Sequence, residues 1–205
     1  MNEPRYQRRK EDRPQEITAA ALDAFAEKGY AATRVEEVAK RAGVSKGLLY
    51  LYFRTKEELF KSVVRSFVVP RIDALTKIID KADMSSEDFL RGPFLDFVKQ
   101  LPGSPVSVVV RLMVAEGPKH PDLVKFYWDN VVSRGLAAIN ALLQRGTLNG
   151  EFRRTAVGEQ PLLFIMPVVF CVIFSQLFGA DRIDTDRIID TQIDLLISHL
   201  KGDAA

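Results

Sequence analysis

Two helix starts and a glycine turn fall within residues 33–59, and this spacing constrains the fold more than any other part of the chain. Thr33 and Glu36 have the spacing of a capping box, which predicts that a helix begins there. Gly43 predicts the end of that helix, because glycine readily enters the left-handed conformation after a C-cap. Ser45 then predicts the N-cap of a second short helix. The segment therefore has the spacing of a helix-turn-helix unit.

The second short helix has one face suited to a core and one suited to an external partner. Leu49 and Phe53 lie four residues apart and are expected to face inward, whereas Lys46 and Tyr50 form a second such pair that can face outward. Gly47 is a poor helix former, and its missing side chain allows a bulky group such as a sugar-phosphate strand to come close. A small helical hairpin inside a larger bundle is the alternative interpretation.

The charge distribution favours a nucleic-acid partner for this segment. Residues 34–61 contain seven Lys or Arg and four Glu, a balance of +3. The whole chain of 205 residues carries only +2. Residues 1–61 have thirteen Lys or Arg against ten Asp or Glu (13 − 10 = +3), which leaves sixteen against seventeen (−1) for residues 62–205. Positive charge is thus concentrated where DNA phosphates would be met.

The segment AFAEKGYAATRVEEVAKRAGVSKG and the following LLYLYFRTKEELF resemble the tetracycline-repressor (TetR) type of bacterial transcriptional regulators. The resemblance covers about residues 14–60. It implies an all-α protein with a three-helix DNA-binding head and a larger, divergent helical body that binds an effector and dimerises. The implied domains are a flexible basic arm (1–13), the helix-turn-helix head (14–60) and the ligand-binding and dimerisation body (61–201). No cofactor or metal is expected.

The same resemblance assigns the early residues of the second short helix to DNA bases. These residues are Lys46, Gly47, Leu48 and Tyr50. Lys46 is suited to donate to guanine O6 and N7, and Leu48 is suited to contact a thymine methyl group.

Other residues of the segment are expected to contact the DNA backbone, which positions a protein without reading sequence. By resemblance they are Thr33, Ser45, Tyr52 and Lys56. Arg34 is expected at a base or a phosphate. For Tyr50 and Tyr52, packing of the ring on a neighbouring helix is the alternative.

The N-terminal residues predict an arm followed by a helix. Arg5, Arg8, Arg9 and Lys10 lie in a polar stretch without apolar periodicity, and they either enter a minor groove or form a solvated tail. Pro14 suits the first turn of a helix that ends at Gly29. Because no apolar h-region follows the basic residues, no secretory signal is expected, and the predicted location is cytoplasmic.

The rest of the chain predicts helices, because apolar and polar residues do not alternate as they do in a strand. Thr55 and Glu58 predict the start of a long connecting helix that Pro70 should kink or break. Further helices are expected at about 86–101, 104–116, 121–146, 157–179 and 184–201. By resemblance, the last two of these helices form a homodimer interface.

Residues 161–179 contain no charged side chain, so a membrane span has to be weighed. Internal Pro167 and the pair Ser175 and Gln176 count against it. A core helix that lines a ligand cavity on one side and meets a partner subunit on the other explains the composition better. We therefore expect no membrane association.

The candidate effector residues are Phe97, Arg111, Phe126 and Phe170, although aromatic residues at helical spacing often belong to an ordinary core. Arg111 lies in an otherwise apolar helix and needs either an internal carboxylate or an acidic group of the effector. No pattern typical of an enzyme or a metal site is present. The single cysteine, Cys171, is expected to fill core space, with an oxidisable sensor thiol as the alternative.

These observations predict a homodimeric DNA-binding regulator, with a repressor as the main hypothesis. A small, largely apolar effector would release it from a near-palindromic operator. The alternatives are an effector-independent DNA-binding dimer and a membrane-associated sensor.

Overall fold

The computed structural model describes the backbone of residues 5–81 and 83–202, with side chains from residue 12 onward in these ranges. All regular secondary structure in this part of the chain is helical, as the sequence predicts. The residues form two compact units. The head unit contains the residues up to Pro70 together with Leu112–Tyr127, and the body unit contains Arg71–Arg111 together with the residues from Trp128 onward. The sequence instead places the boundary between head and body between residues 60 and 61.

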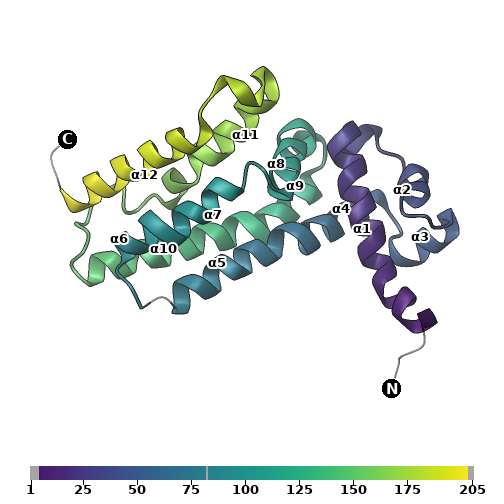
Figure 1. Ribbon diagram of the computed structural model, residues 1–205, viewed down its shortest axis with the longest axis horizontal. Coiled ribbons are helices and arrows are strands. Elements are labelled where there is room, and N and C mark those ends of the chain that lie inside the picture. The colour runs from purple at the N-terminus through teal and green to yellow at the C-terminus, as the bar shows by residue number, and fades with distance from the viewer. Residues whose placement is uncertain (1–4, 82, 203–205) are drawn as a thin grey trace. The chain divides into compact units, whose positions relative to one another are not determined.

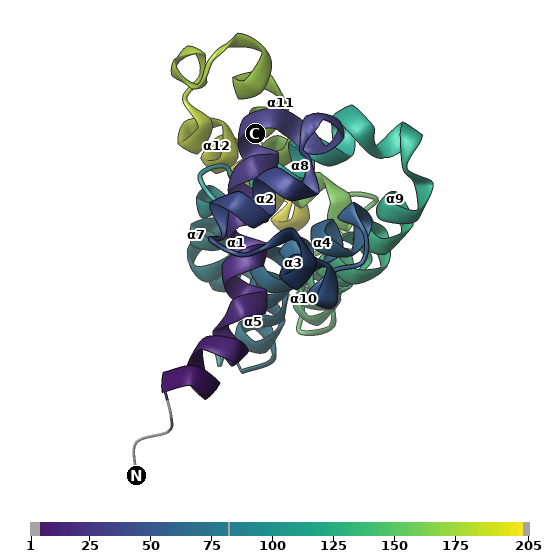
Figure 2. The same cartoon turned by 90° about the vertical axis from the view of Figure 1, so that its right-hand side faces the viewer.

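In the head unit, α1 packs against α2 and α4, α2 packs against α3, and α9 packs against α4 (Figures 1 and 2). Its elements are α1 (Arg5–Ala32), α2 (Val35–Arg41), α3 (Lys46–Tyr52), α4 (Lys56–Val63), the π-helical turn η1 (Val64–Val68), the end of α8 (Pro105–Glu116), the 3₁₀ turn η3 (Gly117–Lys119) and α9 (Pro121–Tyr127). The segment 112–127 is thus a part of the head unit that the sequence assigns to the body.

The first helix starts earlier than the sequence predicts. The backbone is helical from Arg5 onward, and Pro14 lies inside α1 instead of at its first turn. Residues 5–13 are rich in Arg, Lys, Glu and Gln, which are good helix formers. The side chains of Arg5, Arg8, Arg9 and Lys10 lie outside the described part, so their predicted DNA contacts are untested. At the other end, Gly29 adopts φ 77°, which interrupts the helix where the sequence predicts its end.

Aromatic rings form the centre of the head unit. The rings of Phe25, Tyr30 and Phe60 contact one another, with centroid separations of 5.6, 6.0 and 5.7 Å. Phe60 comes from α4 and is fully buried, as is its neighbour Leu59. Because α1 and α4 meet through these rings, α2 and α3 are held on a rigid base.

The connecting helix continues through Pro70 instead of breaking there. Thr55 accepts a hydrogen bond from the backbone N–H of Glu58 at 3.0 Å, which confirms the predicted start of α4. The turn η1 then widens the helix immediately before α5 (Val69–Lys81). A π-turn changes the hydrogen-bonding register of a helix, and it therefore accommodates a proline that has no N–H to donate.

The elements of the body unit follow the predicted segments, with one correction. They are the main part of α5, α6 (Ser86–Phe89), the π-turn η2 (Leu90–Phe94), α7 (Leu95–Gln100), the start of α8, the π-turn η4 (Trp128–Val132), α10 (Ser133–Leu148), the 3₁₀ turn η5 (Pro161–Phe164), α11 (Met166–Phe178), the 3₁₀ turn η6 (Ala180–Arg182) and α12 (Thr185–Lys201). The helix predicted from residue 157 instead begins at Met166. Pro161 and Pro167 each suit a first turn, so two prolines shift the start.

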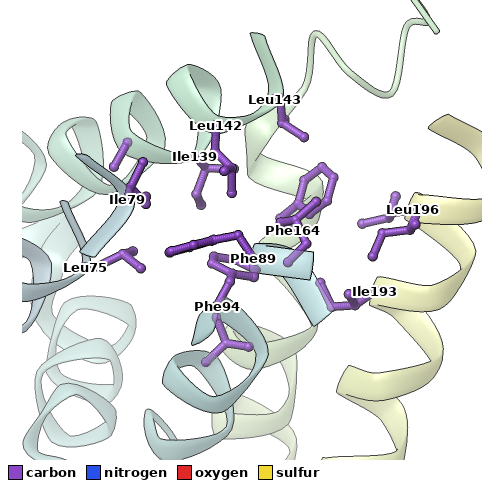
Figure 3. Packing of buried hydrophobic residues seen from close by; sticks show 14 of the residues in the cluster. Leu75, Ile79, Phe89, Phe94, Ile139, Leu142, Leu143, Phe164, Ile193 and Leu196 are labelled. Carbon is purple, nitrogen blue, oxygen red and sulfur yellow. The ribbon is translucent and has the colours of Figure 1, made fainter. Parts of the chain in front are cut away.

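One apolar cluster holds the body unit together. Figure 3 shows side chains converging from α5, the α6–η2 segment, α10, η5 and α12. Phe94 and Phe164 are fully buried, and their rings meet edge to face at 6.5 Å. On the outside, Lys99 pairs with Asp190 at 2.5 Å and thereby links α7 to α12. The cluster packs the helices of this unit against one another.

The uncharged segment near the C-terminus forms a short helix. In α11 only 13 residues are helical, whereas a span needs about 17–25 residues. None of the helices in the described part of the chain combines the length and the apolarity that crossing a membrane requires.

Candidate DNA-binding surface of the head unit

The turn between α2 and α3 is built as the sequence predicts. Gly43 adopts φ 65°, in the left-handed region that favours glycine. The hydroxyl of Ser45 accepts a hydrogen bond from the N–H of Leu48 at 3.1 Å, which confirms the predicted N-cap of α3. Leu49 is fully buried and anchors the inner side of α3. The cap and the anchor together fix which face of this short helix is exposed.

The exposed face of α3 carries three of the predicted base-facing residues. Lys46, Gly47 and Tyr50 are exposed, whereas Leu48 and Tyr52 are half-buried. The ammonium group of Lys46 lies 5.8 Å from the centre of the Tyr50 ring. The outward pair predicted from the four-residue spacing is therefore present.

Lys46 also has an ionic partner that the sequence analysis did not anticipate. Its Nζ lies 2.5 Å from Oε1 of Glu36 on α2. Hydrogen bonding to Lys46 holds the pKa of Glu36 below its ordinary value, and the same bond raises the pKa of Lys46. The cation best placed to meet a base is thus held by a carboxylate of the neighbouring helix.

The predicted role of Thr33 needs correction. Its hydroxyl donates to the carbonyl oxygens of Gly29 at 2.7 Å and Ala24 at 3.1 Å, and the residue is only 2 % exposed. The N-cap of α2 is Arg34, without a side-chain capping bond. The hydroxyl of Thr33 therefore joins the end of α1 to the chain that follows, so it is neither the cap of α2 nor open to a phosphate. Arg34 itself is exposed.

Lys56, like Thr33, donates to backbone carbonyl oxygens at the end of α1. Its ammonium group donates to the carbonyl oxygens of Tyr30, Ala31 and Thr33 at 2.8, 3.0 and 3.2 Å. It also lies 4.6 Å from the centre of the Tyr30 ring, and burial lowers its pKa. A cation on terminal carbonyls compensates the negative end of a helix. The side chain thus completes the end of α1, and its predicted phosphate contact is not supported by this geometry.

The contacts of α9 explain why segment 112–127 belongs to the head unit. The ring of His120 meets the ring of Tyr30 edge to face at 4.9 Å. Phe126 lies beneath two cations of the connecting helix, 5.5 Å from Nζ of Lys61 and 4.9 Å from Cζ of Arg65. Phe126, predicted as an effector residue, therefore joins α9 to α4 and η1. The sequence marks this segment only as a helix end followed by a helix start.

The other predicted effector residues lie in the body unit and do not form one described pocket. Phe97 is half-buried and packs against the apolar cluster, so it is a core residue. Phe170 is 55 % exposed, and its ring lies 5.6 Å from that of Phe174 on the outside of α11, so Phe170 lies on the surface of the body unit. Arg111 is half-buried in α8. A surface hollow of about 350 Å³ in this unit is lined by other, mostly polar residues of α10 and of segment 154–159.

Cys171 lies inside the body unit. It is fully buried, and burial is the main cause that raises the pKa of its thiol. A raised pKa lowers the population of the thiolate, which is the reactive form. The structure thus favours the core role over the sensor role.

Comparisons with known proteins agree with this geometry. Residues 17–63 match the family model described as "Bacterial regulatory proteins, tetR family". The transcriptional repressor KstR2 of Mycolicibacterium smegmatis is 30% identical over 144 residues, covering 69% of this chain and 68% of that protein. The fatty acid metabolism regulator of Bacillus subtilis is 42% identical over 65 residues, covering 29% of this chain and 34% of its own length.

Solved structures resemble the chain over nearly its whole length. A TetR-family regulator from Mesorhizobium loti has a TM-score of 0.74 at 26% identity, covering 96% of this chain and 98% of its own. The regulator FadR from Bacillus subtilis, solved with stearoyl-CoA, has a TM-score of 0.67 at 21% identity, covering 90% and 98%, and this second likeness is one of fold. The chain belongs to the TetR family of bacterial transcriptional regulators.

Proposed function

We propose that this regulator is a repressor that binds a near-palindromic operator as a homodimer, with one α3 in each of two major grooves. The observation that carries the proposal is the capped α3, which is anchored by Leu49 and presents Lys46, Gly47 and Tyr50 outward. A helix of this kind can donate to base edges in the major groove. Such a protein acts where the chromosome lies, in the bacterial cytoplasm.

The contacts follow from exposure and capping. Lys46, Gly47 and Tyr50 face the bases in this proposal, and half-buried Leu48 lies at the edge of the same face. Arg34, Ser45 and Tyr52 contact the DNA backbone in it. The hydroxyl of Thr33 and the ammonium group of Lys56 are left out, because both already have carbonyl partners inside the head unit.

The second copy of the chain is proposed to bind α11 and α12. Several large apolar side chains on these helices are more than half exposed: Met166, Phe170, Leu177, Phe178 and Leu195. The rings of Phe174 and Phe178 lie 4.6 Å apart and extend the exposed row. Contiguous apolar surface of this kind is typical of a protein interface. A homodimer would place one α3 on each side of a two-fold axis.

A small, largely apolar effector is proposed to release the repressor. Fatty-acid regulators are among the relatives, and one structural neighbour was solved with stearoyl-CoA. We therefore propose long-chain acyl thioesters as the first effector class to test. Release requires that the ligand bind the DNA-incompetent state more tightly than the DNA-bound state.

Single substitutions on α3 test the DNA-binding proposal. An operator is first selected from random duplexes with the wild-type protein. Lys46→Ala and Tyr50→Ala should each weaken operator binding by about ten-fold or more, the range for loss of a base contact. Lys40→Ala, an exposed lysine on α2, is the matched control. If folded Lys46→Ala and Tyr50→Ala variants keep wild-type operator affinity, the assignment of α3 is wrong.

Titration of the protein–operator complex tests the effector proposal. Stearoyl-CoA should dissociate the complex, whereas free CoA and free stearate serve as controls for each half of the molecule. If neither stearoyl-CoA nor a shorter acyl thioester releases the protein from the operator, acyl thioesters are not the effector. Operator binding that no apolar ligand changes would instead support an effector-independent dimer.

A further inference from the structure

The exposed face of α3 also includes a leucine. Leu51 is 79 % exposed, twice the 38 % exposure of Tyr50. Successive residues of an α-helix turn by about 100°, so residues three or four apart share a face. Leu51 follows Gly47 by four residues and stands beside Tyr50, whereas buried Leu49 points the opposite way. Leu51 therefore lies on the face of α3 that the proposed function turns toward DNA.

The helix surface at Gly47, one turn before Leu51, is open. In a helix, a side chain leans toward the N-terminus, over the residues three and four positions earlier. For Leu51 these residues are Leu48 and Gly47. A Cβ atom added at Gly47 would meet nothing within 4 Å, so the space beside the leucine is open. Because Gly47 has no side chain, a base edge can come close to the helix backbone beside the apolar side chain of Leu51.

Leu48 is less well placed for the same contact. It is half-buried, and it lies on α3 between the exposed face and the inner side. Its backbone N–H is also the group that Ser45 caps. The helix thus offers two leucines, and the more exposed one lies on the same face as Gly47, opposite buried Leu49.

We infer that Leu51, and not Leu48, supplies the apolar base contact, by packing against the C5 methyl group of a thymine in each operator half-site. Thymine is the base whose major-groove edge carries a methyl group. Burying one methyl group corresponds to about a four-fold change in affinity. Two half-sites of a dimer should therefore change affinity by about fifteen-fold. The inference rests on the proposed function.

The test pairs a change in the protein with removal of the thymine methyl group. Each symmetric pair of thymines in the selected operator is replaced by deoxyuridine, and binding is measured at one salt concentration. For the wild type, one such pair should weaken binding by about fifteen-fold. For Leu51→Ala the same replacement should have no effect, whereas for Leu48→Ala it should still weaken binding relative to that variant's own affinity for the unmodified operator. Because Leu51 is exposed, its truncation should leave the helical circular dichroism signal unchanged.

Other outcomes separate failure of this inference from failure of the proposed function. If the wild type enriches no sequence from random DNA, the proposed function itself fails. If it enriches an operator, but deoxyuridine weakens Leu51→Ala as much as the wild type, only the inference is overturned. Loss of the thymine effect in Leu48→Ala instead would return the contact to Leu48 and overturn it as well.

Discussion

The helices in and directly after the helix-turn-helix unit are shorter than the three C-terminal helices of the body unit. The three helices α2, α3 and α4 have seven or eight residues, whereas α10, α11 and α12 have 13 to 17. Short helices are marginal by themselves, so each depends on its caps and on specific neighbours. Long helices that share an apolar core can be built from many sequences of similar volume. The difference agrees with a family model that matches only residues 17–63.

Truncation of the central aromatic ring of each unit should have the largest effect. Phe94 in the body unit and Phe60 in the head unit are both fully buried. Phe94→Ala and Phe60→Ala should each lower the free energy of unfolding by about 3–5 kcal/mol, because the mutations leave cavities. Urea denaturation measures this change, with fluorescence of the single tryptophan, Trp128, reporting on the body unit. An unchanged Trp128 midpoint in Phe94→Ala would contradict the assigned core.

Two glycines inside helices should respond to alanine in opposite ways. A Cβ atom at Gly146 of α10 would overlap the ring of Phe152, whereas one at Gly47 of α3 meets nothing. Gly146→Ala should therefore destabilise the protein by about 1–3 kcal/mol through overpacking. Gly47→Ala should stabilise it by up to about 1 kcal/mol, because alanine is the better helix former, and should weaken operator binding. Thermal unfolding and operator titration measure these effects. If alanine changed the free energy of unfolding equally at both sites, the inferred difference in packing around the two glycines would be wrong.

The two serine caps should have similar effects on stability and different effects on binding. Ser45 accepts from the N–H of Leu48 at 3.1 Å, and Ser85 accepts from the N–H of Asp88 at 3.0 Å. Alanine at either position should cost about 1 kcal/mol of stability. Only Ser45→Ala should weaken operator binding, since Ser45 caps α3 and is also proposed to contact the DNA backbone. Equal operator affinity in both variants would show that the start of α3 does not matter for binding.

The smallest expected effect concerns the carboxylate that pairs with Lys46. Glu36→Gln should release the ammonium group and remove a negative charge that repels phosphates. Affinity for random DNA should rise by about two- to five-fold, most strongly at low salt. Glu87→Gln, at an acidic residue of the body unit that pairs with Arg91 and Lys201, is the control and should leave DNA affinity unchanged. A rise of the same size in both variants would point to net charge alone.

Local signals predicted much of the head unit and the helical segments of the body. The cap at Ser45, the left-handed Gly43 and the cap at Thr55 each involve groups within four residues of one another, so the sequence is sufficient to predict them. The periodic spacing of apolar residues was equally informative for helices that bury only one face. The start of α1 was missed because nine polar residues give no periodic apolar signal, although they are good helix formers.

The partners of individual polar and aromatic side chains could not be predicted from the sequence. Thr33 and Lys56 have the right types and positions for phosphate contacts, yet both bond to carbonyls at the end of α1. Phe126 and Phe97 look alike as effector candidates, but one joins α9 to the connecting helix and the other packs in the body core. Such choices depend on which elements meet across long separations in the chain.

By itself, then, the sequence determined an all-helical protein with a capped helix-turn-helix, because capping, glycine turns and amphipathic spacing act between near neighbours along the chain. Only the tertiary structure decided that segment 112–127 joins the head unit, that Glu36 holds Lys46, and that Leu51 is the exposed leucine of α3. The physical reason is that burial and pairing are properties of the packed molecule, and they depend on what covers a side chain as much as on its chemistry.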